Sequence, residues 1–261
     1  MSLVILNLDH KNEEIDSVLK NYGLTEYTDK VRKPHLTKFY KRIIDTNVLK
    51  DNGVSYACLN EEALQKGWAI DLKKQGILSF LRIDNGHLDA GLPKTIDINN
   101  KIKAAKDHQL VGLKLRVYID NIDALSMALG NLINYAYLAK KEKLLMICEI
   151  IVKKEWQDKA ERELELFNTI FDKWHKILFN NILIFSVPEN PGIFDDMNRF
   201  EVVKVVAGSD YELSLDEYVE KIKGNNMVYS VSDSVFKGLK VQLSDQQFKN
   251  VMAANLSQLG K

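Results

Sequence analysis

The amino-acid sequence predicts an α/β protein built as a single (β/α)8 barrel. Eight short apolar runs of strand length follow one another along the chain, and stretches with helical apolar spacing lie between them. Strands that alternate with helices form a parallel sheet. The 261 residues divided by eight give about 33 per unit, close to the ~30 that a strand, a helix and their loops require. Eight such units are typical of a closed barrel.

The predicted strands are the apolar runs at 3–8, 54–59, 77–83, 113–119, 144–151, 182–187, 202–207 and 227–232. The clearest helical stretches, in which apolar residues recur at i, i+3 and i+4, are 13–23, 122–141, 156–178, 213–223 and 244–259. Ser244 and Asp245 are candidate capping residues for the last of these helices.

A barrel is favoured over an open doubly wound sheet. An open sheet normally has fewer strands or a glycine-rich first turn, and the turn after the first strand, residues 9–12, contains no glycine. No linker rich in Pro, Gly or Ser and no block of like charge divides the chain. We therefore expect one domain over residues 1–261.

The composition argues against several classes of partner. Lys and Arg total 36 and Asp and Glu total 36, so the formal net charge is zero and offers no reason to expect a nucleic acid or an anionic membrane. The apolar runs are far shorter than the ~20 residues of a membrane span. Two lone cysteines, Cys58 and Cys148, fit a reducing compartment. These features predict a soluble cytoplasmic protein.

Motifs for cofactors and metals are missing from the sequence. The five histidines, 10, 35, 87, 108 and 175, have no metal-binding spacing, and there is no P-loop, G-x-G-x-x-G or G-x-S-x-G motif. We expect neither a metal nor a cofactor. His10 and His87 follow strands and could reach the barrel mouth, but surface positions are the favoured interpretation.

Charged residues interrupt strands that are otherwise apolar. Asp9 follows the first strand, Lys114 and Arg116 lie two apart on the fourth, and Glu149 lies within the fifth. Because residues two apart share one face of a strand, we expect these four side chains to converge at the C-terminal end of the barrel. Two interpretations stay open. The charges form a catalytic floor or the remains of one, or they are rim charges and buried ion pairs.

Several segments in the same order resemble the class I fructose-1,6-bisphosphate aldolases, in particular their short bacterial form. These are LNLDHKNEEIDSVLKNYGL (6–24), GILSFLRIDNG (76–86), GLKLRVYI (112–119), LLMICEIIV (144–152), VVKVVAGS (202–209) and DEYVEKIKGNNMVYSVSDSVFKGL (216–239). The resemblance covers nearly the whole chain. It implies a (β/α)8 barrel that cleaves a ketose bisphosphate through a lysine Schiff base, without metal.

The resemblance also implies roles for the charged residues. Asp9 would assist carbinolamine turnover, and Glu149 would be the general acid on the fifth strand. Lys114 and Arg116 would contact the hydroxyl and phosphate groups of the substrate. Ser209 would belong to the phosphate-binding loop that follows the seventh strand.

This sequence departs from the family at five of the implied site positions. Ile184 stands where the family has its Schiff-base lysine, and an isoleucine cannot form an imine. Ile151 replaces a second glutamate on the fifth strand, and Asn85 replaces a lysine after the third. Asp210 and Asp233 place negative charge where the family binds phosphate, which repels a phosphate in a pocket.

The sequence thus supports two functional hypotheses. In the first, the chain is a catalytically degenerate aldolase homologue that acts as a binding or assembly module. Its ligand would resemble a sugar or sugar phosphate, or it would bind a protein or a second copy of itself. In the second, it is an active carbon–carbon lyase, similar to a transaldolase, that uses Lys114 as a relocated Schiff-base lysine on a substrate other than fructose 1,6-bisphosphate. Burial and the neighbouring Arg116 would then depress the pKa of Lys114. If the family assignment is wrong, the charges are purely structural.

Overall fold

The computed structural model contains a parallel sheet whose strands pair in chain order, and β8 pairs back with β1 to close the ring. The structure describes residues 4–11, 14–24, 26–84, 96–119, 122–152, 181–186, 203–208 and 228–260. The strands are β1 (Val4–Leu8), β2 (Val54–Leu59), β3 (Leu78–Arg82), β4 (Gly112–Ile119), β5 (Leu145–Val152), β6 (Asn181–Ser186), β7 (Val203–Gly208) and β8 (Val228–Val231). All eight predicted strands are confirmed, and no strand end differs from the prediction by more than one residue.

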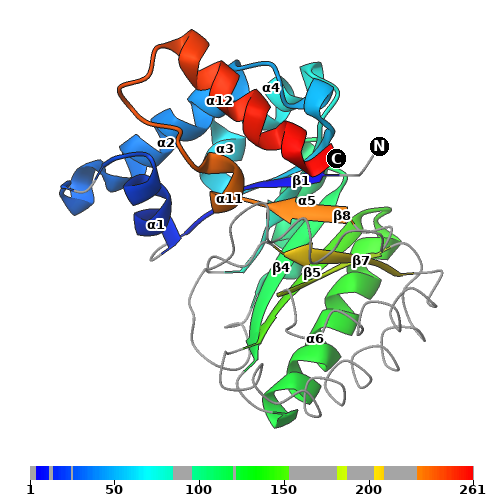
Figure 1. Cartoon of the computed structure of the whole chain (residues 1–261). Helices are drawn as coiled ribbons and strands as arrows, with labels where there is room; N and C mark the ends of the chain where they lie inside the picture. Colours follow the sequence, from blue (N-terminus) through cyan, green and yellow to red (C-terminus); the bar gives the residue numbers. More distant parts are fainter. Residues whose placement is uncertain are drawn as a thin grey trace.

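The described helices lie on the outer side of this sheet (Figure 1). They are α1 (Glu14–Asn21), α2 (Asp29–Asp45), α3 (Glu61–Gln65), α4 (Trp68–Lys74), α5 (Ile98–Asp107), α6 (Ile122–Lys141), α11 (Asp233–Phe236) and α12 (Asp245–Ser257), with short 3-10 turns η1 (Lys50–Asn52) and η2 (Gln258–Gly260). Helix α6 packs against β4 and β5, whereas α1, α2, α4 and α12 gather on the side of β1 (Figure 1).

The α/β class with a parallel sheet is confirmed. Predicted helices 13–23, 122–141 and 244–259 correspond to α1, α6 and α12, and Ser244 caps α12 through a capping box with Gln247. Predicted helices 156–178 and 213–223 lie outside the described residues. The alternation of strand and helix after β5, β6 and β7 therefore stays a prediction, as does the single domain.

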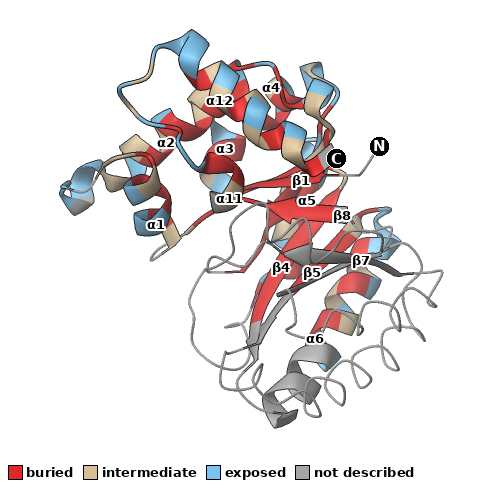
Figure 2. Cartoon of the chain, in the orientation of Figure 1, coloured by how far each residue is buried: buried red, intermediate tan, exposed pale blue. Residues whose placement is uncertain are grey.

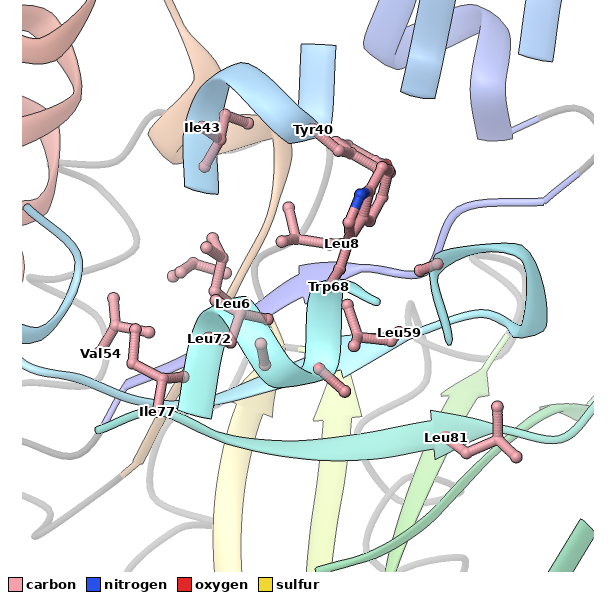
Figure 3. Packing of buried hydrophobic residues seen from close by; sticks show 14 of the residues in the cluster. Leu6, Leu8, Tyr40, Ile43, Val54, Leu59, Trp68, Leu72, Ile77 and Leu81 are labelled. Carbon is pink, nitrogen blue, oxygen red and sulfur yellow. The ribbon is translucent and has the colours of Figure 1, made fainter. Parts of the chain in front are cut away.

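Helix α2 does not stand out in the sequence, because its first half is polar and contains Pro34. Its second half has the apolar spacing of a buried helix, in Leu36, Phe39, Tyr40, Ile43 and Ile44, and all five side chains are buried. Tyr40 meets Trp68 of α4 edge-on with ring centroids 6.2 Å apart, above Leu8 of β1 (Figure 3).

Side chains on β1 alternate between two environments, although the whole strand is buried (Figure 2). Leu6 and Leu8 belong to the large core beneath the helices. Ile5 belongs to a small separate cluster with Cys58, Phe80 and Ile147, the apolar floor inside the barrel. Both cysteines are buried. Two residues further along, the same inward face is polar or charged on β1, β3 and β5, at Asn7, Arg82 and Glu149.

Gly112, the first residue of β4, makes room for this apolar floor. A Cβ at this position would lie 2.8 Å from the carbonyl carbon of Leu145 and from Cε1 of Phe80. Because backbone cannot move aside as a flexible side chain can, only glycine fits here. The ring of Phe80 therefore fills the barrel below the charged layer that β4 carries.

Candidate functional site: a buried ionic cluster in the barrel

The structure brings the four predicted residues together inside the barrel. Nζ of Lys114 lies 2.9 Å from Oδ2 of Asp9 and 3.0 Å from Oε2 of Glu149. Nε of Arg116 lies 2.7 Å from the same Glu149 oxygen. Arg116 and Glu149 are register partners on β4 and β5, and Asp9 directly follows β1. The predicted convergence is confirmed, and all four side chains are buried.

Lys114 is fully surrounded by oxygen. Besides Asp9 and Glu149, its ammonium donates a hydrogen bond of 2.8 Å to Oδ1 of Asn7, whose amide in turn donates to Ser230. Three oxygen atoms thus lie within 3.0 Å of the ammonium, one in a hydrogen bond and two in ion pairs. The carboxylate of Asp9 offsets the charge of Lys114 without accepting a hydrogen bond from it. The Lys114 side chain has no exposed surface.

The pKa of Lys114 is raised above its ordinary value of 10.5. Burial alone would lower this pKa, but the negative charges of Asp9 and Glu149 outweigh burial. The sequence interpretation that burial and Arg116 depress the pKa of Lys114 is therefore wrong. Arg116 is itself paired with carboxylates, so its charge is largely offset where it faces Lys114.

Three further charged residues complete the cluster. Arg82, the last residue of β3, lies 2.6 Å from Oε2 of Glu14 and 2.9 Å from Oδ1 of Asp84. Glu14, at the start of α1, also pairs with Arg116. Asp84 accepts a hydrogen bond of 3.0 Å from the main-chain amide of Arg116.

We call this set the ionic cluster: Asp9, Glu14, Arg82, Asp84, Lys114, Arg116 and Glu149. Its four carboxylates and three cations leave one net negative charge. Lys11, whose ammonium donates to the main-chain carbonyl of Asp84, lies beside the cluster and offsets that charge. Burying charge is costly unless it is paired, and here nearly every charge has a partner of opposite sign.

The carboxylates of the cluster stay ionised at neutral pH. Burial would raise the pKa of Glu14, but Arg116 and Arg82 hold this pKa at about 2. Burial likewise opposes ionisation of Asp9 and Glu149, yet the neighbouring cations lower the pKa of both. A general acid or base works best with a pKa near the working pH. The ionic cluster therefore contains no carboxylate poised to exchange a proton near pH 7.

Glu14 is the member that the sequence pattern does not reveal. Strand 3 visibly ends in charge, at Arg82 and Asp84, but Glu14 reads as an ordinary acidic residue in the first turn of a helix. The position of Glu14, shortly after Asp9, is the sequence signal that could have revealed it, because α1 then begins over the barrel mouth.

His10 is buried, so its interpretation as a surface histidine is wrong. Its ring hydrogen-bonds the hydroxyl of Tyr40 through Nδ1 and lies near the ring of Phe236. The reason is α2, which places Tyr40 over the end of β1.

Among the described residues, no group of His, Cys, Asp and Glu is arranged to hold a metal ion, and no helix is long and apolar enough to cross a membrane.

The remaining predicted positions are only partly described. Ile184 lies on β6 with its backbone paired to Glu149, Ile151 lies on β5, and Asp233 begins α11. Asn85, Ser209 and Asp210, together with His87, lie outside the described residues.

Comparison with solved structures places the fold among aldolase-like barrels. An archaeal fructose 1,6-bisphosphate aldolase matches with a TM-score of 0.67 at 11% identity, over 99% of this chain and 93% of that one. An archaeal aldolase structure with the catalytic lysine bound to the carbinolamine intermediate matches with a TM-score of 0.65 at 10% identity, over 100% and 94%. Tryptophan synthase from M. tuberculosis matches with a TM-score of 0.54 at 10% identity, over 99% and 92%.

No protein-family model matches the sequence. At identities of 10–11%, the likeness to solved structures establishes the fold and not the activity. The match to tryptophan synthase also shows that a similar fold does not imply the same activity, because that enzyme is not an aldolase by name.

Replacing Lys114 should strongly destabilise the protein. Lys114→Met leaves Asp9 and Glu149 buried without their shared cation, and breaking a buried pair in this way costs about 3–5 kcal/mol. Lys106→Met is the matched control, because it removes a surface pair with Glu142 and should change the stability little. Urea unfolding measures both. A Lys114→Met variant as stable as the control would contradict the assigned network.

Glu14 should make stability depend on acid pH. Its folded pKa of about 2 lies below the ordinary 4.5, so its contribution is complete above pH 4.5 and is lost as the pH falls toward 2. Glu14→Gln should therefore be less stable at pH 7 and lose less stability over that interval. Denaturant unfolding at several pH values tests this, with the exposed Glu26→Gln as control. If the free energy of unfolding fell equally with pH in the native protein and in Glu14→Gln, the effect would be ruled out.

Proposed function

We propose that the chain is a divergent homologue of the class I fructose-1,6-bisphosphate aldolases that has lost aldol cleavage and acts as a binding module. In this proposal residues 1–261 form a single-domain (β/α)8 barrel. The observation that carries it is the state of Lys114, an ammonium with no exposed surface and three oxygen partners. The segment-by-segment resemblance and the fold likeness over nearly the whole chain support the family.

Imine formation requires a neutral amine that can reach a carbonyl carbon. At the position of the family's lysine the chain has Ile184, whose backbone pairs with Glu149 on the next strand. Lys114 is the candidate replacement, but its raised pKa keeps the amine protonated and its partners hold it inside the barrel. The relocated-lysine hypothesis is therefore disfavoured.

Asp9, Arg116 and Glu149 have a different use in this proposal. They occupy positions that carry catalysis in the family, yet here they neutralise one another and Lys114 and thereby join β1, β4 and β5. Ser209 would be a remnant of the phosphate loop. Asp210 and Asp233, by the resemblance, oppose the binding of phosphate groups.

In this proposal the partner is a small molecule or a protein. The protein needs neither metal nor cofactor and lies in the cytoplasm. A glycolytic role would require the cleavage activity that this proposal considers lost, so the proposal does not include such a role.

The native protein should not cleave fructose 1,6-bisphosphate or form a borohydride-stable adduct with dihydroxyacetone. Ile184→Lys should form that adduct, because it restores an amine beside Glu149. Ile184→Met is the matched control, similar in size but without an amine. Coupled assays report triose phosphate, and intact mass reports adducts.

Two results would contradict this account. Steady triose phosphate release by the native protein, abolished by Lys114→Ala, would establish the relocated lysine. A folded Ile184→Lys variant that traps no carbonyl compound would show that the sixth strand does not correspond to that of the family.

A further inference from the structure

A cavity of about 240 Å³ lies beside the ionic cluster, where β1 and β2 end. The turn after β1 lines it through His10 and Lys11, α2 covers it with Lys33 and Leu36, and α4 contributes Trp68. Loops at the C-terminal ends of the strands are where barrels of this kind bind their ligands. This cavity lies outside the ionic cluster and shares none of its seven residues.

The free charge that faces the cavity is positive. Glu61 and Glu62 line it, but Glu61 pairs with Lys101, and Glu62 accepts a hydrogen bond from Thr37 and lies 3.7 Å from Lys66.

The two lysines of the cavity are less engaged. Within the described part of the chain, Lys33 makes no hydrogen bond or ion pair, and the ammonium of Lys11 donates only to the main-chain carbonyl of Asp84. Two cations with unused donors thus border one cavity.

The rest of the wall is largely apolar. Ile15, Leu36 and Trp68 line the cavity, and Trp68 packs edge-on against Tyr40 (Figure 3). A volume of about 240 Å³ is below the ~300–1,000 Å³ that holds drug-sized ligands. At ~30 Å³ per water-sized group it accommodates about eight non-hydrogen atoms, close to the size of benzoate. A sugar bisphosphate is too large for it and would leave the apolar wall unused.

We propose that this cavity binds a small organic anion with an apolar body, of the size of an aromatic or branched carboxylate. The carboxylate would pair with Lys11 and Lys33, and the apolar body would pack on Ile15, Leu36 and Trp68. The inference rests on the proposed function, in which the barrel binds a ligand without cleaving it.

The electrostatics of Lys11 support an anionic ligand. Burial lowers the pKa of Lys11. Asp84 opposes this shift, Arg82 adds to it, and Asp9 and Glu61 oppose it more weakly. A bound carboxylate would add a further negative charge beside this half-buried ammonium, so binding and protonation of Lys11 favour each other.

Benzoate is a suitable probe. Acetate, which lacks the apolar body, and benzyl alcohol, which lacks the charge, are the control ligands. The full-length ¹⁵N-labelled protein is titrated with each and followed by the indole N–H signal of Trp68, assigned by its loss in Trp68→Phe. Saturation-transfer NMR on the ligand gives the same binding constants without that variant. Benzoate should shift the indole signal saturably and bind more tightly than the other two.

Lys33→Gln should weaken benzoate binding about tenfold, since it removes one charge-assisted contact. Lys33 is exposed, so this variant should fold. Lys30→Gln, an exposed lysine on the same helix that does not line the cavity, should bind like the native protein.

Equal affinity for benzoate and benzyl alcohol, equal affinity of the two lysine variants, or no binding to the folded native protein would each overturn the site. None of these measurements uses an aldolase substrate. Cleavage of fructose 1,6-bisphosphate by a protein that binds benzoate as described would therefore overturn the proposed function alone.

Discussion

The ammonium of Lys114 is the group on which the interior of this barrel depends. It lies inside the sheet with no exposed surface, between Asp9, Asn7 and Glu149. A buried cation is tolerated only when carboxylates offset it, and those carboxylates then require further cations. The other members of the ionic cluster meet this requirement in turn. Arg116 pairs with Glu149, Glu14 pairs with Arg116, and Arg82 pairs with Glu14. The network thereby connects β1, β3, β4, β5 and the first helix.

Much of this arrangement was predictable because parallel strands buried on both faces consist of apolar residues. The eight strands follow from that rule, and charges such as Lys114 and Glu149 stand out against it. The period of two along each strand also predicts that these charges share a face. The apolar floor of Ile5, Cys58, Phe80 and Ile147 lies one such step before the charged layer.

What could not be predicted depends on distances and on helix packing. The direction of the pKa shift of Lys114 depends on how many carboxylates lie within 3.0 Å, and sequence spacing does not contain that number. Glu14 joins the cluster through the angle at which α1 leaves the turn after β1. The burial of His10 depends on Tyr40, which α2 supplies from 30 residues further along the chain. Pro34 and the polar first half of α2 obscured that helix.

The central claim is that Lys114 is a permanently charged structural cation, and its titration tests this most directly. The ¹⁵Nζ signal of Lys114, assigned by its absence in Lys114→Met or Lys114→Arg, can be followed by NMR as the pH of the native protein rises. We predict a midpoint above the ordinary 10.5, or a charge retained until the barrel unfolds. The stability that Lys114 contributes is then present below pH 10.5 and lost above it. A midpoint below 10.5 in the folded protein would contradict the account and return Lys114 to the candidates for an imine-forming amine.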